Sequence, residues 1–181
     1  FVPGQAHGMH TLTGLAHDRS SHVAYDPESN EESIHFRSLK LAALQKTLKT
    51  PPVFTRNVEA VLRIARERGQ KVLLLTYAYH LPPDYTNQRF LAQQTDYSFM
   101  PESVATEVWG RKENVVAAIE AHNAAIRRLA ERHPEALFFD MERYMPKDRE
   151  HFIDICHWTD LGRETFARGV LEAIARHDSE L

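Results

Sequence analysis

Apolar residues that recur about every 3.6 positions predict four amphipathic helices in this chain. The predicted helices cover residues 36–48, 57–68, 113–132 and 160–176. Pro51 and Pro52 are expected to end the first helix, and Gly69 follows the second in the position of a C-terminal cap. Thr159 precedes the last helix as its N-cap, and Ile174 is expected among that helix's inward residues.

Two continuous apolar runs are too short for helices. Val72 to Thr76 follows the second predicted helix, and Ala136 to Asp140 follows the third. Such runs are typical of strands that are covered on both faces of a parallel sheet. The alternation of helix and strand therefore predicts an α/β fold with helical crossovers. Because such sheets usually have about five or six strands, part of the sheet is expected to lie outside this chain.

The remaining stretches interrupt every hydrophobic period. Residues 1–35 are rich in Gly, His, Ser, Asp and Pro and predict an irregular excursion. Residues 77–111 predict a long irregular insertion, with a helical turn near residues 104–109. A length of 181 residues fits one domain, with residues 36–176 forming its helices and strands.

Composition narrows the class of protein. The chain is 43% hydrophobic and 26% charged, which is close to a globular average and excludes a wholly disordered chain. No apolar run reaches the roughly 18 residues that cross a bilayer. The net charge of −3, with basic residues scattered along the chain, argues against a nucleic-acid partner. Cys156 is the single cysteine, which excludes an internal disulfide and a cysteine-based zinc cluster.

The strongest chemical signal precedes the last helix. Asp154 and His157 are three residues apart, so the carboxylate can accept the Nδ1 proton of the imidazole and leave Nε2 facing outward. A general base is oriented in this way in Ser-His-Asp catalysis. Taken alone, the spacing is common, and a solvated surface pair is its alternative interpretation.

The surrounding sequence resembles the C-terminal part of the SGNH hydrolases, the GDSL-type esterases and lipases. Two upstream segments, NVEAVLRIARERGQKVLLLTYAY and HNAAIRRLAERHPEALFFDM, look like the last two helix–strand units of that family. The resemblance covers about residues 57–174 and implies a three-layer α/β/α sandwich with a parallel, flavodoxin-like sheet. The matching residues of the final block are Phe152, Asp154, His157, Thr159 and Gly162.

Two other blocks of the family are absent. No serine of the chain stands in a G-D-S block after a buried strand, and no asparagine stands in a G-x-N-D block. Both blocks precede the matching region in the family, so the chain is expected to be an N-terminally truncated piece. It would hold the acid and the base, with the nucleophile outside it, and would be inactive alone.

The resemblance implies a serine esterase or lipase without metal or cofactor. His157 would take the proton from the serine and return it to the leaving alcohol, while Asp154 stabilises the imidazolium. The substrate would be a small-molecule ester, either a carbohydrate-linked acetyl group or a lipid acyl group. The alternative function is a non-catalytic SGNH-like binding module or an inactive fragment.

Four further residues are candidates for substrate binding. Tyr77, Tyr79 and His80 follow a predicted strand, at the sheet edge where ligands bind in open α/β folds. Their alternative role is to cover the strand end. Trp158 follows His157 and either forms a pocket wall or packs under the last helix. Asn123 interrupts an apolar stripe, which predicts a buried side chain that tethers a loop.

A metal site is a weaker hypothesis. The N-terminal histidines would serve a metal-dependent hydrolase, but they lack a helical H-E-x-x-H pattern. The alternative is a solvated loop. These histidines are His7, His10, His17 and His22. Cys156 is expected to point away from the neighbouring imidazole and to act as a small buried filler.

Overall fold

The computed structural model describes residues 50–179 of the chain. The predicted excursion 1–35, with its histidines, and the predicted helix 36–48 lie outside this range. The elements in chain order are α3 (Thr50–Glu67), β1 (Leu73–Leu75), α4 (Asn87–Leu91), the 3₁₀ helix η1 (Thr106–Val108), α5 (Lys112–Arg132), β2 (Leu137–Phe139), α6 (Met141–Tyr144) and α7 (Asp160–Ser179). No helix in this part of the chain has the length and hydropathy to span a membrane.

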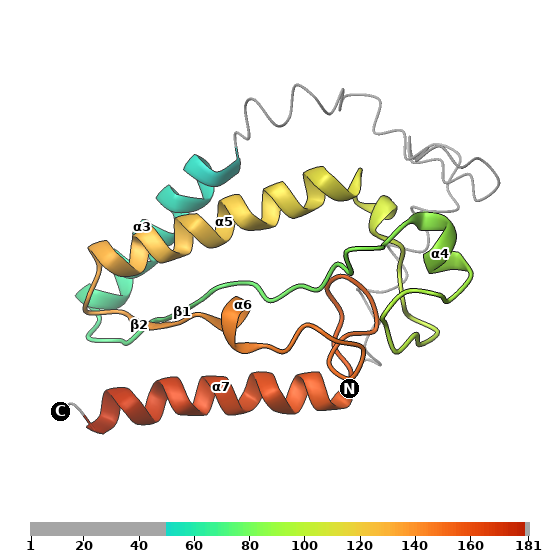
Figure 1. Cartoon of the computed structure of the whole chain (residues 1–181). Helices are drawn as coiled ribbons and strands as arrows, with labels where there is room; N and C mark the ends of the chain where they lie inside the picture. The colour runs from blue at the N-terminus through green and yellow to red at the C-terminus, as the bar shows by residue number, and fades with distance from the viewer. Residues whose placement is uncertain (1–49, 180–181) are drawn as a thin grey trace, which may run out of the picture.

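The two strands form a small parallel sheet, as the sequence predicted. Leu73 pairs with Leu137 and Leu75 pairs with Phe139. Helices α3 and α5 lie on one side of the strands, and α7 lies on the other (Figure 1). The described residues therefore have a mixed α/β architecture, with α5 as the crossover between β1 and β2.

Helix α3 begins earlier than the sequence predicted. Pro51 and Pro52 lie in the first turn of α3, where a turn between helices was expected, and the helix 36–48 that they were expected to end lies outside the described residues. A helix tolerates proline in its first turn because the first N–H groups have no intrahelical acceptor. The expected cap at the other end is present. Gly69 has a φ of +64°, and the N–H of Gln70 donates to the carbonyl of Ala65 at 2.8 Å, which is the Schellman arrangement.

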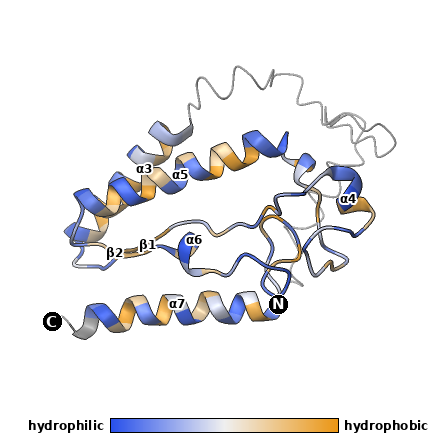
Figure 2. Ribbon diagram, in the orientation of Figure 1, coloured by the Kyte–Doolittle hydropathy of each residue, from blue (hydrophilic) through white to orange (hydrophobic). Residues whose placement is uncertain are grey.

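Two groups of buried side chains hold the layers together. Leu62 of α3, Leu74 of β1 and Leu129 of α5 pack together on one side of the sheet. A second group, which includes Phe139 and Ala173, joins the strands to α7 and to the insertion that follows β1. Hydrophobic and hydrophilic residues alternate around α5 and α7, as helices with one buried side require (Figure 2).

The start of α7 is fixed by a cap and a close contact. The N–H of Gly162 donates to Thr159 Oγ1 at 3.0 Å, which confirms the predicted N-cap. A Cβ atom on Gly162 would lie 2.3 Å from the carbonyl oxygen of His151, so only glycine lets the helix approach this closely. Ile174 was expected to point inward, but it is 42% exposed.

The insertion 77–111 contains more structure than the sequence predicted. Helix α4 is capped by Thr86, whose side chain accepts from the N–H of Arg89, and η1 supplies the predicted helical turn. Tyr85 and Tyr97 are almost completely buried, at 1% and 0% exposure. This irregular segment is therefore a packed part of the domain, and it contacts the loop described next.

Candidate active site

A closed loop between α6 and α7 carries the candidate catalytic pair. Phe152 and Trp158 form an antiparallel bridge across the base of the loop. The N–H of Ile153 donates to the carbonyl of His157 at 3.0 Å, and the N–H of Thr159 donates to the carbonyl of His151 at 3.0 Å. These cross-connections close the loop into a fixed shape and direct Asp154 into the interior.

Asp154 is completely buried and hydrogen-bonded on both oxygens. Its Oδ1 accepts the main-chain N–H groups of Cys156 at 3.0 Å and His157 at 2.8 Å. Its Oδ2 accepts the N–H of Val104 at 2.7 Å, from the insertion. Since all three partners are donors, the surroundings match the carboxylate form.

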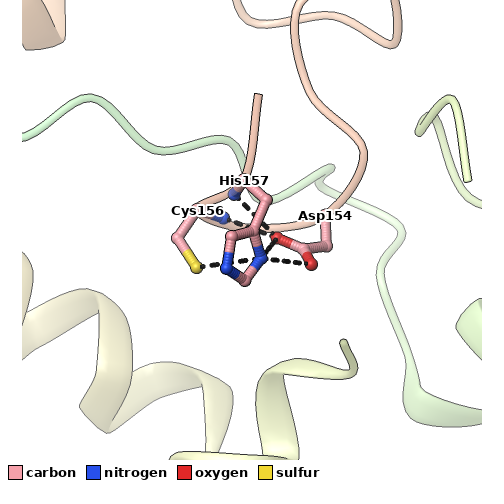
Figure 3. Close-up of side chains that lie close together, drawn as sticks. All are labelled: Asp154, Cys156 and His157. Carbon is pink, nitrogen blue, oxygen red and sulfur yellow. Dashed lines mark hydrogen bonds and ion pairs between the residues drawn. The ribbon is translucent and has the colours of Figure 1, made fainter. Parts of the chain in front are cut away.

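His157 places one ring nitrogen on this carboxylate and the rest of its ring near the surface. Nδ1 lies 2.8 Å from Asp154 Oδ2 and 3.0 Å from Oδ1 (Figure 3). The side chain is 47% exposed. With Nδ1 facing the carboxylate, Nε2 is the nitrogen left to exchange a proton with a reactant. The ring of Trp109 flanks the imidazole, with centroids 6.2 Å apart.

A second Asp and His with the same spacing lie six residues earlier, and their burial is reversed. His151 Nδ1 lies 2.7 Å from Asp148 Oδ1, but here the histidine side chain is 10% exposed and the aspartate 41% exposed. A buried imidazole cannot reach a substrate. Only the 154–157 pair combines an exposed base with a buried carboxylate, and the sequence pattern alone does not make this distinction.

Cys156 lies beside the pair without being an activated thiol. Its Sγ is 3.7 Å from His157 Nδ1, so the side chain does not point away from the ring as the sequence suggested (Figure 3). Burial, together with the negative charge of Asp154, raises the pKa of the thiol to about 12. The thiolate needed for nucleophilic attack is therefore disfavoured.

The same three side chains form the group in the described residues that could hold a metal ion. Ligand atoms of Asp154, Cys156 and His157 lie within 4.8 Å of one another. A cation bound at Nδ1 would replace the proton shared with Asp154 and would compete with three main-chain N–H donors. The thiol would also have to lose its proton against its raised pKa. The donor set therefore suits proton transfer better than metal binding.

Segments distant in the sequence anchor the loop on both sides. The insertion contributes the N–H of Ser98, which donates to the carbonyl of Phe152, and Ser103 Oγ, which donates to that of Ile153, both at 3.0 Å. From the segment after β1, the N–H of His80 donates to the carbonyl of Ile155 at 3.0 Å. The polar main-chain groups of an irregular segment give no sequence signal, so these contacts were not predictable.

The four predicted substrate-binding residues occupy different places. Tyr77 is 46% exposed and lies near Cys156, so it borders the site. The hydroxyl of Tyr79 donates to Glu120 Oε1 at 2.5 Å and so turns toward α5. His80 is 7% exposed and lies behind the loop. The ring of Trp158 stacks on Phe166 of α7, with centroids 4.7 Å apart.

Asn123 of α5 binds the main chain directly after β1, next to the site. Its Oδ1 accepts the N–H of Tyr77 at 2.7 Å, and its Nδ2 donates to the carbonyl of Tyr77 at 2.9 Å. The predicted tethering role of this buried side chain is confirmed. Beside it lies an apolar groove of about 430 Å³, which Phe54, Leu75, Tyr77, Ala118, Ile119, His122, Asn123 and Ile126 line.

Asp140, at the end of β2, belongs to an ionic network away from the pair. Arg127 of α5 donates to both of its oxygens at 2.9 Å, and Thr76 Oγ1 donates to Oδ1 at 2.8 Å. Burial opposes ionisation of Asp140, but these hydrogen bonds outweigh it and hold its pKa below the ordinary value. The network ties α5 to the ends of both strands.

The described serine side chains do not approach the base. Ser98 Oγ donates to the carbonyl of Arg149, and Ser103 Oγ donates to that of Ile153. Neither hydroxyl is hydrogen-bonded to His157. Comparisons with protein-family models, with curated proteins and with solved structures gave no match. The functional interpretation therefore depends on the site itself and on the sequence pattern around it.

Proposed function

We propose that this chain supplies the general acid–base pair of a serine-type ester hydrolase. The observation that carries the proposal is the exposed imidazole of His157, whose Nδ1 lies 2.8 Å from the fully buried carboxylate of Asp154. This arrangement fixes the tautomer and leaves Nε2 free to transfer a proton. The SGNH-like sequence around the pair supports the same assignment.

In the proposed reaction His157 Nε2 removes the proton from a serine hydroxyl as its oxygen attacks the ester carbonyl. Asp154 stabilises the imidazolium that forms. The imidazolium then gives its proton to the leaving alcohol, and an acyl-serine remains. Water attacks the acyl-serine in the same way, with His157 as the base, and releases the acid and the free serine. No step needs a metal or a cofactor.

We assign the nucleophilic serine and the oxyanion donors to a segment outside these 181 residues. The edge of β1 that faces away from β2 supports this assignment, because no other strand among the described residues pairs with it. Val72 O and Thr76 N bond to β2, so the alternating pattern of a parallel ladder directs the main-chain groups of Leu73 and Leu75 to the other side. Further strands paired there would extend the sheet toward the proposed three-layer sandwich.

The proposed substrate is a small-molecule ester with a carbohydrate-linked acetyl group or a lipid acyl group. Tyr77 is the best placed of the predicted substrate-binding residues, because it is half exposed and joins the site to the apolar groove. Tyr79, His80 and Trp158 would support the site from behind or from the side.

One observation favours a second candidate function. No described serine side chain is hydrogen-bonded to His157. A binding module derived from such an enzyme would show the same arrangement. The two candidates differ in turnover, since a binding module would retain ligand affinity without hydrolysis.

The test is hydrolysis of p-nitrophenyl acetate and p-nitrophenyl butyrate by the natural polypeptide that contains this chain. His157→Ala and Asp154→Asn are expected to lower kcat/KM by about 10³–10⁴-fold. His151→Ala is the matched control, because it removes the second, buried histidine of the same spacing, and it should retain most activity. Turnover that survives His157→Ala would overturn the proposal, and affinity without any turnover would favour the binding module.

A further inference from the structure

His80 is buried directly behind the loop that carries the candidate pair. Its side chain is 8% exposed. The main-chain N–H of His80 donates to the carbonyl of Ile155 at 3.0 Å, and the main-chain carbonyl of His80 accepts the hydroxyl of Tyr97 at 2.7 Å. The residue thus joins the segment after β1 to the centre of the loop.

Two aromatic rings enclose the imidazole. The centroid of Tyr97 is 5.5 Å away at an interplanar angle of 80°, and that of Phe152 is 5.6 Å away at 51°. Phe152 begins the loop and forms the bridge that closes it. The imidazole therefore contacts the loop through Phe152, and the main-chain N–H of the same residue holds the loop at Ile155.

The imidazole has a buried nitrogen without a hydrogen-bond partner. His80 Nε2 is buried and makes no hydrogen bond, and Oδ2 of Asp96 lies 3.7 Å from it. This separation exceeds a hydrogen bond, and the Asp96 side chain is 49% exposed, so it has room to move. A buried nitrogen without a hydrogen bond destabilises the folded state, unless a change of its charge or position gives it a partner.

The charged groups around His80 have opposite effects on the pKa of its imidazole. Asp96 comes from the segment after α4, and Lys147 and Asp148 come from the segment after α6. Burial lowers the pKa of His80, which Lys147 reinforces and the two aspartates oppose. Lys147 is itself held by the carbonyl of Tyr79 at 2.6 Å, so its charge stays near the site. The pKa of His80 therefore lies below its ordinary value, which favours the uncharged imidazole.

We propose that His80 is a positioning residue for the Asp154–His157 pair: it holds the loop while neutral and releases it when protonated. A protonated ring enclosed by Tyr97 and Phe152 needs a counter-charge, and of the two aspartates Asp96 has an oxygen 3.7 Å from Nε2. A movement of the ring that closes the 3.7 Å separation would change its contacts with Tyr97 and Phe152, and Phe152 belongs to the bridge that closes the loop. The catalytic meaning of this shift rests on the proposed function, but the shift itself does not require turnover.

The test is a pH titration of the 181-residue chain by NMR, between about pH 4 and 8, which follows histidine side chains and main-chain amides. We expect His80 to titrate with a midpoint below 6.5. The amides of Phe152 and Cys156 should shift with the same midpoint. His80→Phe fills the aromatic enclosure with a ring that does not titrate, and it should remove this step. Asp96→Asn should lower the His80 midpoint further.

Two outcomes would overturn the proposal. One is loop amides that do not shift with the midpoint of His80, and the other is a step that persists unchanged in His80→Phe. His157→Gln is the control, and the amide shifts that follow His80 should remain in it. If His80→Phe disturbs the fold, His80→Gln provides a second side chain that does not titrate. Because no step of the test measures hydrolysis, its failure is distinct from failure of the proposed function.

Discussion

The main-chain N–H of Val104 donates to Asp154 Oδ2 at 2.7 Å, across a separation of 50 residues. This hydrogen bond makes the irregular insertion part of the site, because it completes the set of donors around the buried carboxylate. The donors fix the orientation of Asp154, and Asp154 in turn fixes the ring of His157. The geometry of the His157 ring therefore depends on a segment that contributes no side chain to the Asp154–His157 pair.

Asp154→Asn should destabilise the domain. The amide NH₂ group cannot accept the N–H groups that the carboxylate accepts, so at least one buried donor loses its partner. We expect a loss of about 1–3 kcal/mol in the free energy of unfolding, measured by urea denaturation. Asp148→Asn is the control and should cost less, since Asp148 is 41% exposed and water can reach its partners. Equal losses would contradict the role assigned to the buried carboxylate.

Gly162→Ala should destabilise the junction between the loop and α7. The added Cβ would lie 2.3 Å from the carbonyl oxygen of His151, and the backbone must move to relieve the contact. We expect a loss of about 1–3 kcal/mol by thermal or urea denaturation, although alanine is the better helix former. Glu164→Ala, at an exposed position of the same helix, should stay within about 0.5 kcal/mol of the wild type. A neutral Gly162→Ala would show that the helix approaches the loop less closely.

Asn123→Leu should destabilise the domain, because it removes the side-chain amide at the edge of β1. Both main-chain groups of Tyr77 would lose their partners, and we expect a cost of about 2–4 kcal/mol in unfolding free energy. Arg128→Ala changes an exposed residue of the same helix and serves as the control. In hydrogen exchange, the amide of Tyr77 should lose protection in Asn123→Leu alone. Retained protection would mean that another group satisfies this edge.

The Arg127–Asp140 pair should give stability that acid removes. The folded-state pKa of Asp140 lies below its ordinary value of 3.8, so its contribution is present above that pH and is lost as pH falls through the folded-state pKa. Arg127→Met should therefore be less stable than the wild type at neutral pH, by about 1–3 kcal/mol. The difference should shrink below about pH 4 in urea denaturation series. A difference that does not change with pH would assign the effect to packing alone.

Much of the regular structure could be predicted from the sequence, because each element has a strong local signal. The apolar stripe before Gly69 predicted α3, and the two short apolar runs predicted β1 and β2. Thr159 predicted the start of α7. The start of α3 was predicted too late, at residue 57, because proline was taken to mark a turn and also fits the first turn of a helix. The prediction that Ile174 points inward was wrong, because the helical period does not say how far the sheet extends.

The site was predictable in its residue types and spacing but not in its environment. Asp148 and His151 have the same spacing as Asp154 and His157, and only tertiary packing buries one aspartate and the other histidine. The N–H of Val104 carries no side-chain signal at all. The role of His80 also depends on packing, since its position after a strand predicts proximity to the site but not burial behind it.

The central claim is that His157 serves a nucleophilic serine that lies outside these 181 residues. The most direct measurement is fluorophosphonate labelling of the protein from its native source, followed by intact mass and peptide mapping. The account predicts one labelled serine N-terminal to Phe1, with labelling lost in His157→Ala and kept in His151→Ala. A native mass equal to that of these 181 residues with no label, or a label on a serine within them, would contradict it.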